Sequence, residues 1–268
     1  MKKKNLLGFS ALFFGYAFLY LPILYLVVFS FNQSSVAGVW DGFSMKWYSV
    51  LLQNDAIMHA LLTSLQIAGT SATLAVLLGT MAAISMIRLG SFKGRTFLSG
   101  LLPAPLVMPE VITGLSLLLM FVTFERMIGW PSERGALTVV IAHSTIGIAY
   151  VYMIVSSRLR DFDTVLEEAA QDLGATPSVV FFRVTLPLIV PSLLSGWLLS
   201  FALSLDDVVI ASFLSGPGAT TLPIVLFSSL RLGVSPEINA LSGIMIGIVS
   251  LCVLVSGVIF YKKRTSIQ

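Results

Sequence analysis

Residues 161–192 read DFDTVLEEAAQDLGATPSVVFFRVTLPLIVPS and are the most informative part of the 268-residue chain. Thr164 is followed three places later by Glu167, which is the spacing of a capping box. A short helix is therefore predicted from Val165 to Leu173. Gly174 comes directly after it and is suited to end the helix, because glycine adopts the left-handed conformation at little cost.

A second helix start follows within the same stretch. Thr176 precedes Pro177, and a proline at the first helical position gives up no hydrogen bond. The sequence thus predicts two short helices joined at a glycine elbow. Ala169 and Ala170 would lie at its tip, beside the acidic Glu168, where small side chains let another backbone approach closely. From these residues alone, an amphipathic hairpin on a membrane surface and a helix that docks on a partner protein both remain open.

The chain as a whole is too apolar for a water-soluble protein. It is 56% hydrophobic and 11% charged, with a mean hydropathy of +0.94, whereas about a quarter of a soluble domain is charged. Six runs are long enough to cross the hydrocarbon core of a bilayer, which takes about 20 apolar residues in a helix. They are residues 6–31, 61–87, 98–122, 136–157, 188–214 and 238–261. We therefore predict an all-α membrane protein of about six transmembrane helices, with residues 1–268 forming a single transmembrane domain.

The distribution of positive charge predicts the orientation. Of the 16 lysines and arginines, three lie in each of four segments: the N-terminus, the loop after the second run, the loop after the fourth run and the C-terminus. The other four are Lys46, Arg126, Arg134 and Arg231. Because cytoplasmic loops carry the excess of positive charge, both termini and the loop at about 158–187 are predicted to be cytoplasmic. The cations are dispersed beside apolar segments, which argues against a nucleic-acid partner.

The cytoplasmic loop resembles the EAA loop of bacterial ABC-importer permeases. The shared pattern is Glu168-Ala169-Ala170, three residues, Gly174, nine residues, Val184 where the family usually has isoleucine, one residue, and Leu186-Pro187. The resemblance implies the ABC type I importer permease fold. It also implies that the loop forms coupling helices, which sit in a cleft of a separate ATPase subunit and transmit its closure to the pore.

Further segments resemble the spermidine/putrescine, or polyamine, importers, and most nearly the permeases of putrescine systems. These segments are PLVMPEVITGLSLLL from Pro105, SLDDVVIASFLSGPGATTLP from Ser204 and VSPEINALSG from Val234. The resemblance implies a multi-pass protein of the bacterial inner membrane that transports and does not catalyse. It implies a heterodimer with a second permease, two ATPase subunits and a periplasmic polyamine-binding protein. ATP and magnesium would bind the partner ATPase, with no cofactor in this chain, which has no P-loop pattern.

Three acids lie in apolar runs, where an ionised carboxylate is costly unless it has a partner or a role. Glu110 follows three prolines, the last of them Pro109, which predict a broken helix whose free backbone groups line a cavity. Asp206 and Asp207 lie near the outer end of the fifth run. Neighbouring residues on a helix point about 100° apart, so one aspartate is expected to face the substrate pathway while the other caps a helix or contacts a partner subunit.

Other interpretations of these residues remain open. Glu110 can instead cap the helix after Pro109, and both aspartates can serve only to hold a helix break. An intramembrane enzyme would use Asp206 and Asp207 as acid and base, and a secondary transporter would use them to bind its substrate. His143 is interpreted as a locally satisfied side chain, and no metal site is predicted. The choice between putrescine, spermidine and another small cation stays open.

Overall fold

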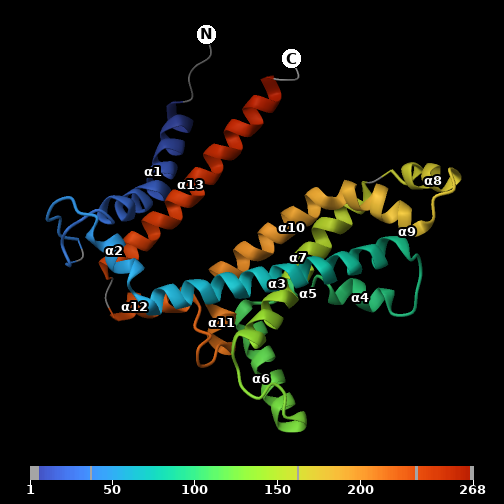
Figure 1. The fold of residues 1–268 in the computed structure, drawn as a ribbon, viewed down its shortest axis with the longest axis horizontal. Helices are drawn as coiled ribbons and strands as arrows, with labels where there is room; N and C mark the ends of the chain where they lie inside the picture. The colour runs from blue at the N-terminus through green and yellow to red at the C-terminus, as the bar shows by residue number, and fades with distance from the viewer. Residues whose placement is uncertain (1–5, 37, 162, 233–234, 266–268) are drawn as a thin grey trace. The chain divides into compact units, whose positions relative to one another are not determined.

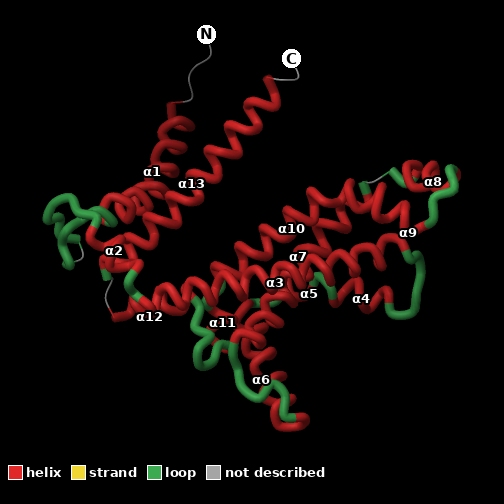
Figure 2. The backbone as a smooth tube through the Cα atoms, in the orientation of Figure 1, coloured by secondary structure: helices red, strands yellow, loops and turns green. Residues whose placement is uncertain are grey.

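The computed structural model describes residues 6–36, 38–161, 163–232 and 235–265. Helices joined by short loops make up this part of the chain (Figures 1 and 2), with a single antiparallel bridge between Asn32 and Phe43. In chain order they are α1 (Leu6–Phe29), α2 (Lys46–Leu52), α3 (Asp55–Arg88), α4 (Arg95–Leu101), α5 (Ala104–Val107), α6 (Glu110–Ile128), α7 (Ala136–Arg160), α8 (Val165–Asp172), α9 (Pro177–Val180), the π-helical turn η1 (Phe181–Thr185), α10 (Leu186–Asp206), α11 (Val209–Leu214), α12 (Leu222–Leu232) and α13 (Pro236–Thr265).

The chain divides into two compact units. The terminal unit comprises Met1–Met58 and Ser228–Gln268, and the central unit comprises His59–Phe227. In the terminal unit, α13 packs against α1 and α2. The hydroxyls of Ser30 and Tyr48 lie 2.8 Å apart, and an added Cβ on Gly243 would lie 2.9 Å from the Tyr48 oxygen. Glycine at position 243 therefore allows α13 to approach closely.

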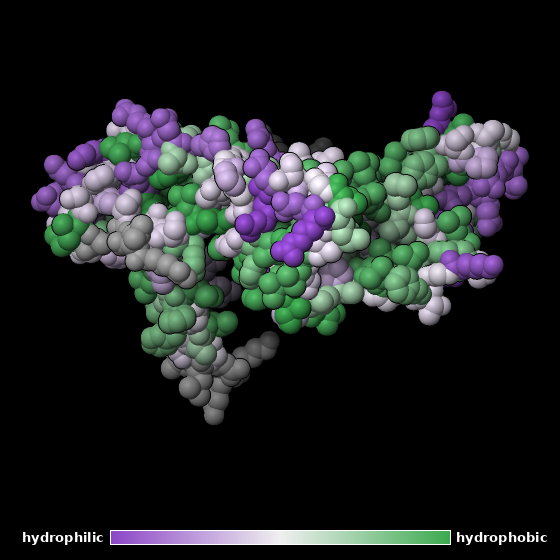
Figure 3. Space-filling view, turned by 90° about the horizontal axis from the view of Figure 1, so that it is seen from below, coloured by the Kyte–Doolittle hydropathy of each residue, from purple (hydrophilic) through white to green (hydrophobic). Residues whose placement is uncertain are grey.

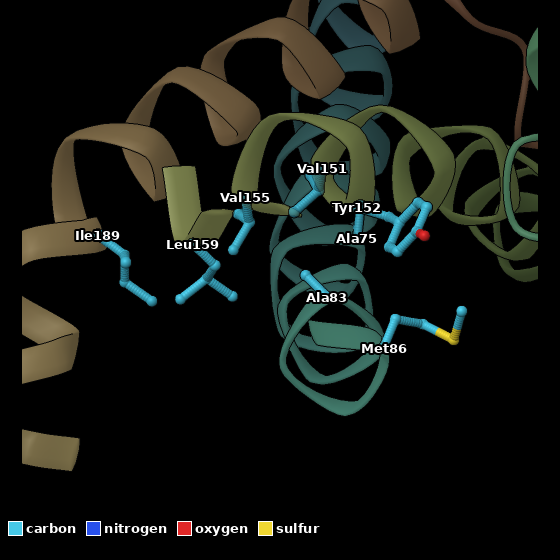
Figure 4. Close-up of a cluster of buried hydrophobic side chains, with 8 residues drawn as sticks. All are labelled: Ala75, Ala83, Met86, Val151, Tyr152, Val155, Leu159 and Ile189. Atoms are coloured by element: carbon cyan, nitrogen blue, oxygen red, sulfur yellow. The ribbon is translucent and has the colours of Figure 1, made fainter. Parts of the chain in front are cut away.

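Small residues hold the central unit together. α10 packs along α7, and an added Cβ on Gly147 of α7 would lie 2.7 Å from Cβ of Ala75 in α3 and 3.1 Å from the Ser200 hydroxyl in α10. Between helices in a membrane, where lipid is as apolar as the side chains, association depends on such close approach. One buried cluster, drawn in Figure 4, joins α3, α7 and α10 through Ala75, Ala83, Met86, Val151, Tyr152, Val155, Leu159 and Ile189. The cluster fixes these three helices as one packed body.

The predicted all-α membrane fold is confirmed. Among the described residues, five helices are long and apolar enough to cross a bilayer: Gly8–Phe29, Asp55–Arg88, Glu110–Ile128, Ala136–Arg160 and Pro177–Asp206. The sixth predicted span falls on α13, whose apolar segment Pro236–Leu251 is shorter. Large apolar side chains face outward, such as Phe9 at 75% and Phe18 at 79% exposure in α1, and hydrophobic residues cover much of the face shown in Figure 3. Lipid is the solvent that suits such a surface.

Two of the predicted spans are broken, which corrects their boundaries. Residues 98–122 form α4, α5 and the start of α6, because Pro103 and Pro109 interrupt the helix. Met108, the residue before Pro109, is extended, as the clash with a following proline ring favours. Residues 188–214 bend at Asp207, whose ψ of 122° ends α10 before α11 begins.

The predicted orientation stays a prediction. Lys2, Lys3 and Lys4, on which it partly rests, lie outside the described residues. The side chains of Lys262, Lys263 and Arg264 lie outside them as well, although the backbone there belongs to α13.

Candidate functional site

The EAA-like loop folds into the predicted elbow at Gly174. Gly174 has a φ of 85°, in the left-handed region, and its N–H donates to the carbonyl of Gln171 at 2.8 Å. The N–H of Ala175 donates to the carbonyl of Ala170 at 3.1 Å. These two bonds form a Schellman motif, which satisfies the last carbonyls of α8. The helix end predicted from Gly174 is therefore confirmed.

The predicted capping box at the start of α8 is wrong. Thr164 makes no side-chain bond to the helix; the N–H of Val165 instead donates to Oδ1 of Asp163 at 3.0 Å. The carboxylate of Glu167, expected to reach back to Thr164, accepts from Arg88 at 3.1 Å and from the Thr185 hydroxyl at 2.5 Å. A guanidinium is a stronger donor than a backbone N–H, so the distant partner prevails over the local one.

The second predicted helix begins where expected but does not stay short. Thr176 is extended and α9 starts at Pro177, as the sequence indicates. The helix then continues through η1 into α10 with Leu186 and Pro187 in its first turn, so that residues 177–206 form one long element. Pro187 lacks an N–H for the helical ladder, and the wider π-helical turn lies directly before it.

The surface of α8 suits a protein partner. Figure 1 shows α8 and α9 at one end of the central unit. Every residue of α8 is at least partly exposed, including Glu168, Ala169 and Ala170. Leu166 is 50% exposed and Leu173, just after the helix, is 89% exposed. Small and apolar side chains exposed together on a projecting loop are typical of an interaction surface.

All three acids predicted for the substrate pathway line one cavity in the central unit. The cavity has a volume of about 340 Å³ and lies where α5, α6, α7, α10 and α11 meet. Glu110 reaches it from the first residue of α6, Asp206 from the last residue of α10, and Asp207 from the break that follows. Apolar and aromatic side chains line the rest, among them Leu106, Met108, Ile146, Tyr150, Leu203 and Ile210.

Asp207 is held in place by three donors. Its carboxylate accepts from the N–H groups of Ile210 at 3.2 Å and Ala211 at 2.7 Å, and so caps the start of α11. Nε2 of His143 lies 3.0 Å from Oδ2 of the same carboxylate. The expectation that Asp206 and Asp207 diverge on one helix is wrong, because Asp207 is already outside α10. That one of the two caps a helix agrees with the sequence prediction.

His143 is the cavity residue that the sequence interpretation missed. Its side chain is only 4% exposed, and its Nδ1 lies 2.6 Å from the Ser204 hydroxyl. The Ser71 hydroxyl of α3 donates in turn to Ser204 at 3.3 Å. With Ser204 donating to Nδ1 and Nε2 donating to Asp207, one neutral tautomer satisfies every bond. The signal that could have indicated this role is the presence of an ionisable residue inside an apolar run.

Glu110 and Asp206 differ from Asp207 in having no protein partner among the described residues. Both side chains are exposed to the cavity, and no hydrogen bond or ion pair within residues 6–36, 38–161, 163–232 and 235–265 engages either carboxylate. Glu110 lies at the N-terminus of α6, where the partial positive charge of the helix favours an anion. Two carboxylates with free acceptor sites thus face one cavity whose walls include apolar side chains.

Known proteins resemble the chain in sequence and in fold. Residues 75–263 match the family described as binding-protein-dependent transport system inner membrane component. The putrescine transport system permease protein PotI of Escherichia coli K12 is 56% identical over 240 residues, which cover 90% of this chain and 85% of that protein. The spermidine/putrescine transport system permease protein PotC of the same strain is 39% identical over 250 residues, covering 93% and 92%. A bacterial ABC transporter involved in the import of the acidic polysaccharide alginate has a TM-score of 0.70 at 14% identity, covering 97% of this chain and 98% of that one.

Proposed function

The chain belongs to the family of binding-protein-dependent transport system inner membrane components, and from this membership we propose that it moves polyamines, putrescine first, as one permease subunit of an ATP-driven importer. It is a multi-pass subunit of the bacterial inner membrane that transports its cargo and leaves ATP hydrolysis to a separate subunit. Its closely related proteins carry polyamine transport in their names, which favours the same class of cargo here.

The assembly in which it works has four kinds of subunit. This chain pairs with a second permease, and two ATPase subunits bind the pair from the cytoplasm. A periplasmic polyamine-binding protein delivers the cargo, and ATP and magnesium bind the ATPases alone. The exposed surface around Glu168, Ala169 and Ala170 supports a docking role for α8, and the Schellman turn at Gly174 holds that surface in one shape.

The cavity supports a dication as cargo. Putrescine is a flexible apolar chain with an ammonium at each end, so its passage calls for separated carboxylates with apolar or aromatic walls between them. Glu110 and Asp206 supply carboxylates with free acceptor sites, and Tyr150 and Leu106 supply apolar wall. Asp207 already has three donors, which leaves it less capacity for a cargo ammonium. The structural observation that best supports the cargo proposal is therefore that the carboxylates of Glu110 and Asp206, which have free acceptor sites, line the same cavity.

Reconstitution in proteoliposomes tests the proposal. The chain is purified with its ATPase, second permease and binding protein, and uptake of radiolabelled putrescine and spermidine is measured with ATP on the ATPase side. We expect uptake that requires both ATP and the binding protein, with putrescine preferred. A complex carrying an ATPase subunit that binds but does not hydrolyse ATP is the matched control.

Two results would contradict the proposal. Uptake driven by an ion gradient without ATP would indicate a secondary transporter, and conversion of a lipid-linked substrate by the chain alone would indicate an intramembrane enzyme. ATP-dependent uptake of a neutral or anionic cargo in place of polyamines would retain the permease and refute the cargo.

A further inference from the structure

A single carboxylate joins the projecting helix α8 to two other elements of the central unit. Oε1 of Glu167 accepts from Nη2 of Arg88, the last residue of α3, at 3.1 Å. The same oxygen accepts from the hydroxyl of Thr185, the last residue of η1, at 2.5 Å. Thr185 is buried, and the side chains of Arg88 and Glu167 are 24% and 17% exposed. The junction is therefore largely shielded from water and from competing ions.

Apolar packing contributes little to the attachment of α8. The helix has no buried residue; its Leu166 is 50% exposed, and Leu173 directly after it is 89% exposed. The elements that it packs against are α9 and η1, which follow it in the chain. Glu167 thus provides a side-chain link from α8 to Arg88 of α3, which lies 79 positions earlier in the chain.

The two partners of Glu167 lie at the ends of separate elements, α3 and η1, and α3 and the helix after η1 both extend toward the cavity. Arg88 ends α3, which carries Ser71 about 17 positions earlier, or roughly 25 Å at helical rise. Thr185 precedes α10, which ends at Asp206 in the cavity wall. The buried cluster of Figure 4 packs the intervening parts of α3 and α10 against α7. Close-packed helices move as bodies, so a displacement at Arg88 and Thr185 reaches the cavity.

We propose that Glu167, with Arg88 and Thr185, forms a clamp that passes movement of α8 to α3 and α10 and so sets how much transport each ATP drives. Glu167 is a positioning residue that acts through the two helices and does not touch cargo or ATP. The inference rests on the proposed function, since it needs an ATPase acting on α8. It adds to that function a defined route from the docking surface to the cavity.

The test measures the coupling ratio, which is putrescine taken up per ATP hydrolysed in the reconstituted complex. Glu167→Gln removes one charge and keeps the shape of the side chain, and Arg88→Gln removes one charge and shortens the side chain. Arg160→Gln is the matched control: it makes the same substitution at an exposed arginine, the last residue of α7, for which no bond to Glu167 is seen among the described residues. We expect ATP hydrolysis to persist and the ratio to fall about tenfold in both clamp variants, as loss of one charge-assisted hydrogen bond predicts. Arg88→Lys, which keeps the charge, is expected to recover part of the ratio.

Each outcome decides the matter. A lower ratio in the two clamp variants with an unchanged ratio in Arg160→Gln supports the clamp, whereas wild-type ratios in all three overturn it. If neither Glu167→Gln nor Arg88→Gln assembles with the ATPase, the contact serves folding or docking and the transmission role is refuted. Wild-type uptake that does not depend on ATP would overturn the proposed function itself, and the clamp with it.

Discussion

Asp206 and Asp207 are adjacent in the sequence, yet replacing each by asparagine should affect different properties: stability for Asp207 and transport for Asp206. Asp207 accepts from two backbone N–H groups and from His143, while no described residue donates to Asp206. In Asp207→Asn, an amide can still cap α11, because asparagine and aspartate are nearly equal caps. The charge-assisted bond to the buried His143 is lost, and a donor of that kind left unsatisfied costs about 1–3 kcal/mol.

The expected results separate stability from transport. A loss of about 1–3 kcal/mol in the free energy of unfolding corresponds to a midpoint lower by roughly 2–12 °C for a chain of this size class. Asp206→Asn removes no hydrogen bond or ion pair to a described residue, so the free energy of unfolding should change by less than about 0.5 kcal/mol. Its half-saturation for putrescine should instead rise about tenfold, the effect of losing one ammonium–carboxylate bond.

Two measurements check this contrast: thermal unfolding of the purified complex, followed by its size-exclusion peak, and putrescine uptake normalised to assembled complex. Ser212→Ala, at an exposed hydroxyl of α11, controls for general effects of substitution near the cavity. The reasoning is refuted if Asp207→Asn keeps wild-type stability, or if Asp206→Asn transports with wild-type half-saturation.

Three further predictions follow from the fold. Gly174→Asp places a charged L-residue at a φ of 85°, which costs about 1 kcal/mol or more and distorts the turn after α8, so ATPase binding in a pull-down should weaken while membrane insertion persists. Gly147→Val puts methyl groups where a Cβ alone would lie 2.7 Å from Ala75, so assembled complex in membranes should fall severalfold, and a wild-type yield would refute the packing of α3 on α7. Reporter fusions near Lys93 should report cytoplasm and those near Ser132 periplasm; the inverse pattern would contradict the orientation and the placement of the docking loop.

The features of the fold that depend on residues close together in the sequence were predicted from it. Long apolar runs gave the spans because a bilayer leaves a helix no alternative for its backbone groups. Gly174 predicted the end of α8 because only glycine adopts its conformation freely. Pro109 predicted the break before α6, although the predicted span 98–122 begins twelve positions before Glu110 and ends six positions before Ile128.

Contacts between residues that lie far apart in the sequence could not be predicted from it. The capping box failed because Glu167 is engaged by Arg88, which no local spacing indicates. The three acids could be nominated from their apolar surroundings, but their meeting in one cavity depends on how α6, α7 and α10 pack. His143 was passed over because its partner Asp207 lies 64 positions away. Their roles in transport stay predictions until the variants above are measured.

The break before α6 has a consequence for which ions the protein tolerates. A helix that begins at a cavity presents there a partial charge of about +0.5, which by itself attracts anions and repels cations. Glu110 is the first residue of α6, and its carboxylate reverses that sign to a net of roughly −0.5 at the same place. The carboxylate of Glu110 thus changes the charge at this end of the cavity from one that repels cations to one that attracts them. A permease that keeps this broken helix is therefore expected to exchange cationic for anionic cargo through a change at this position, without any change of fold.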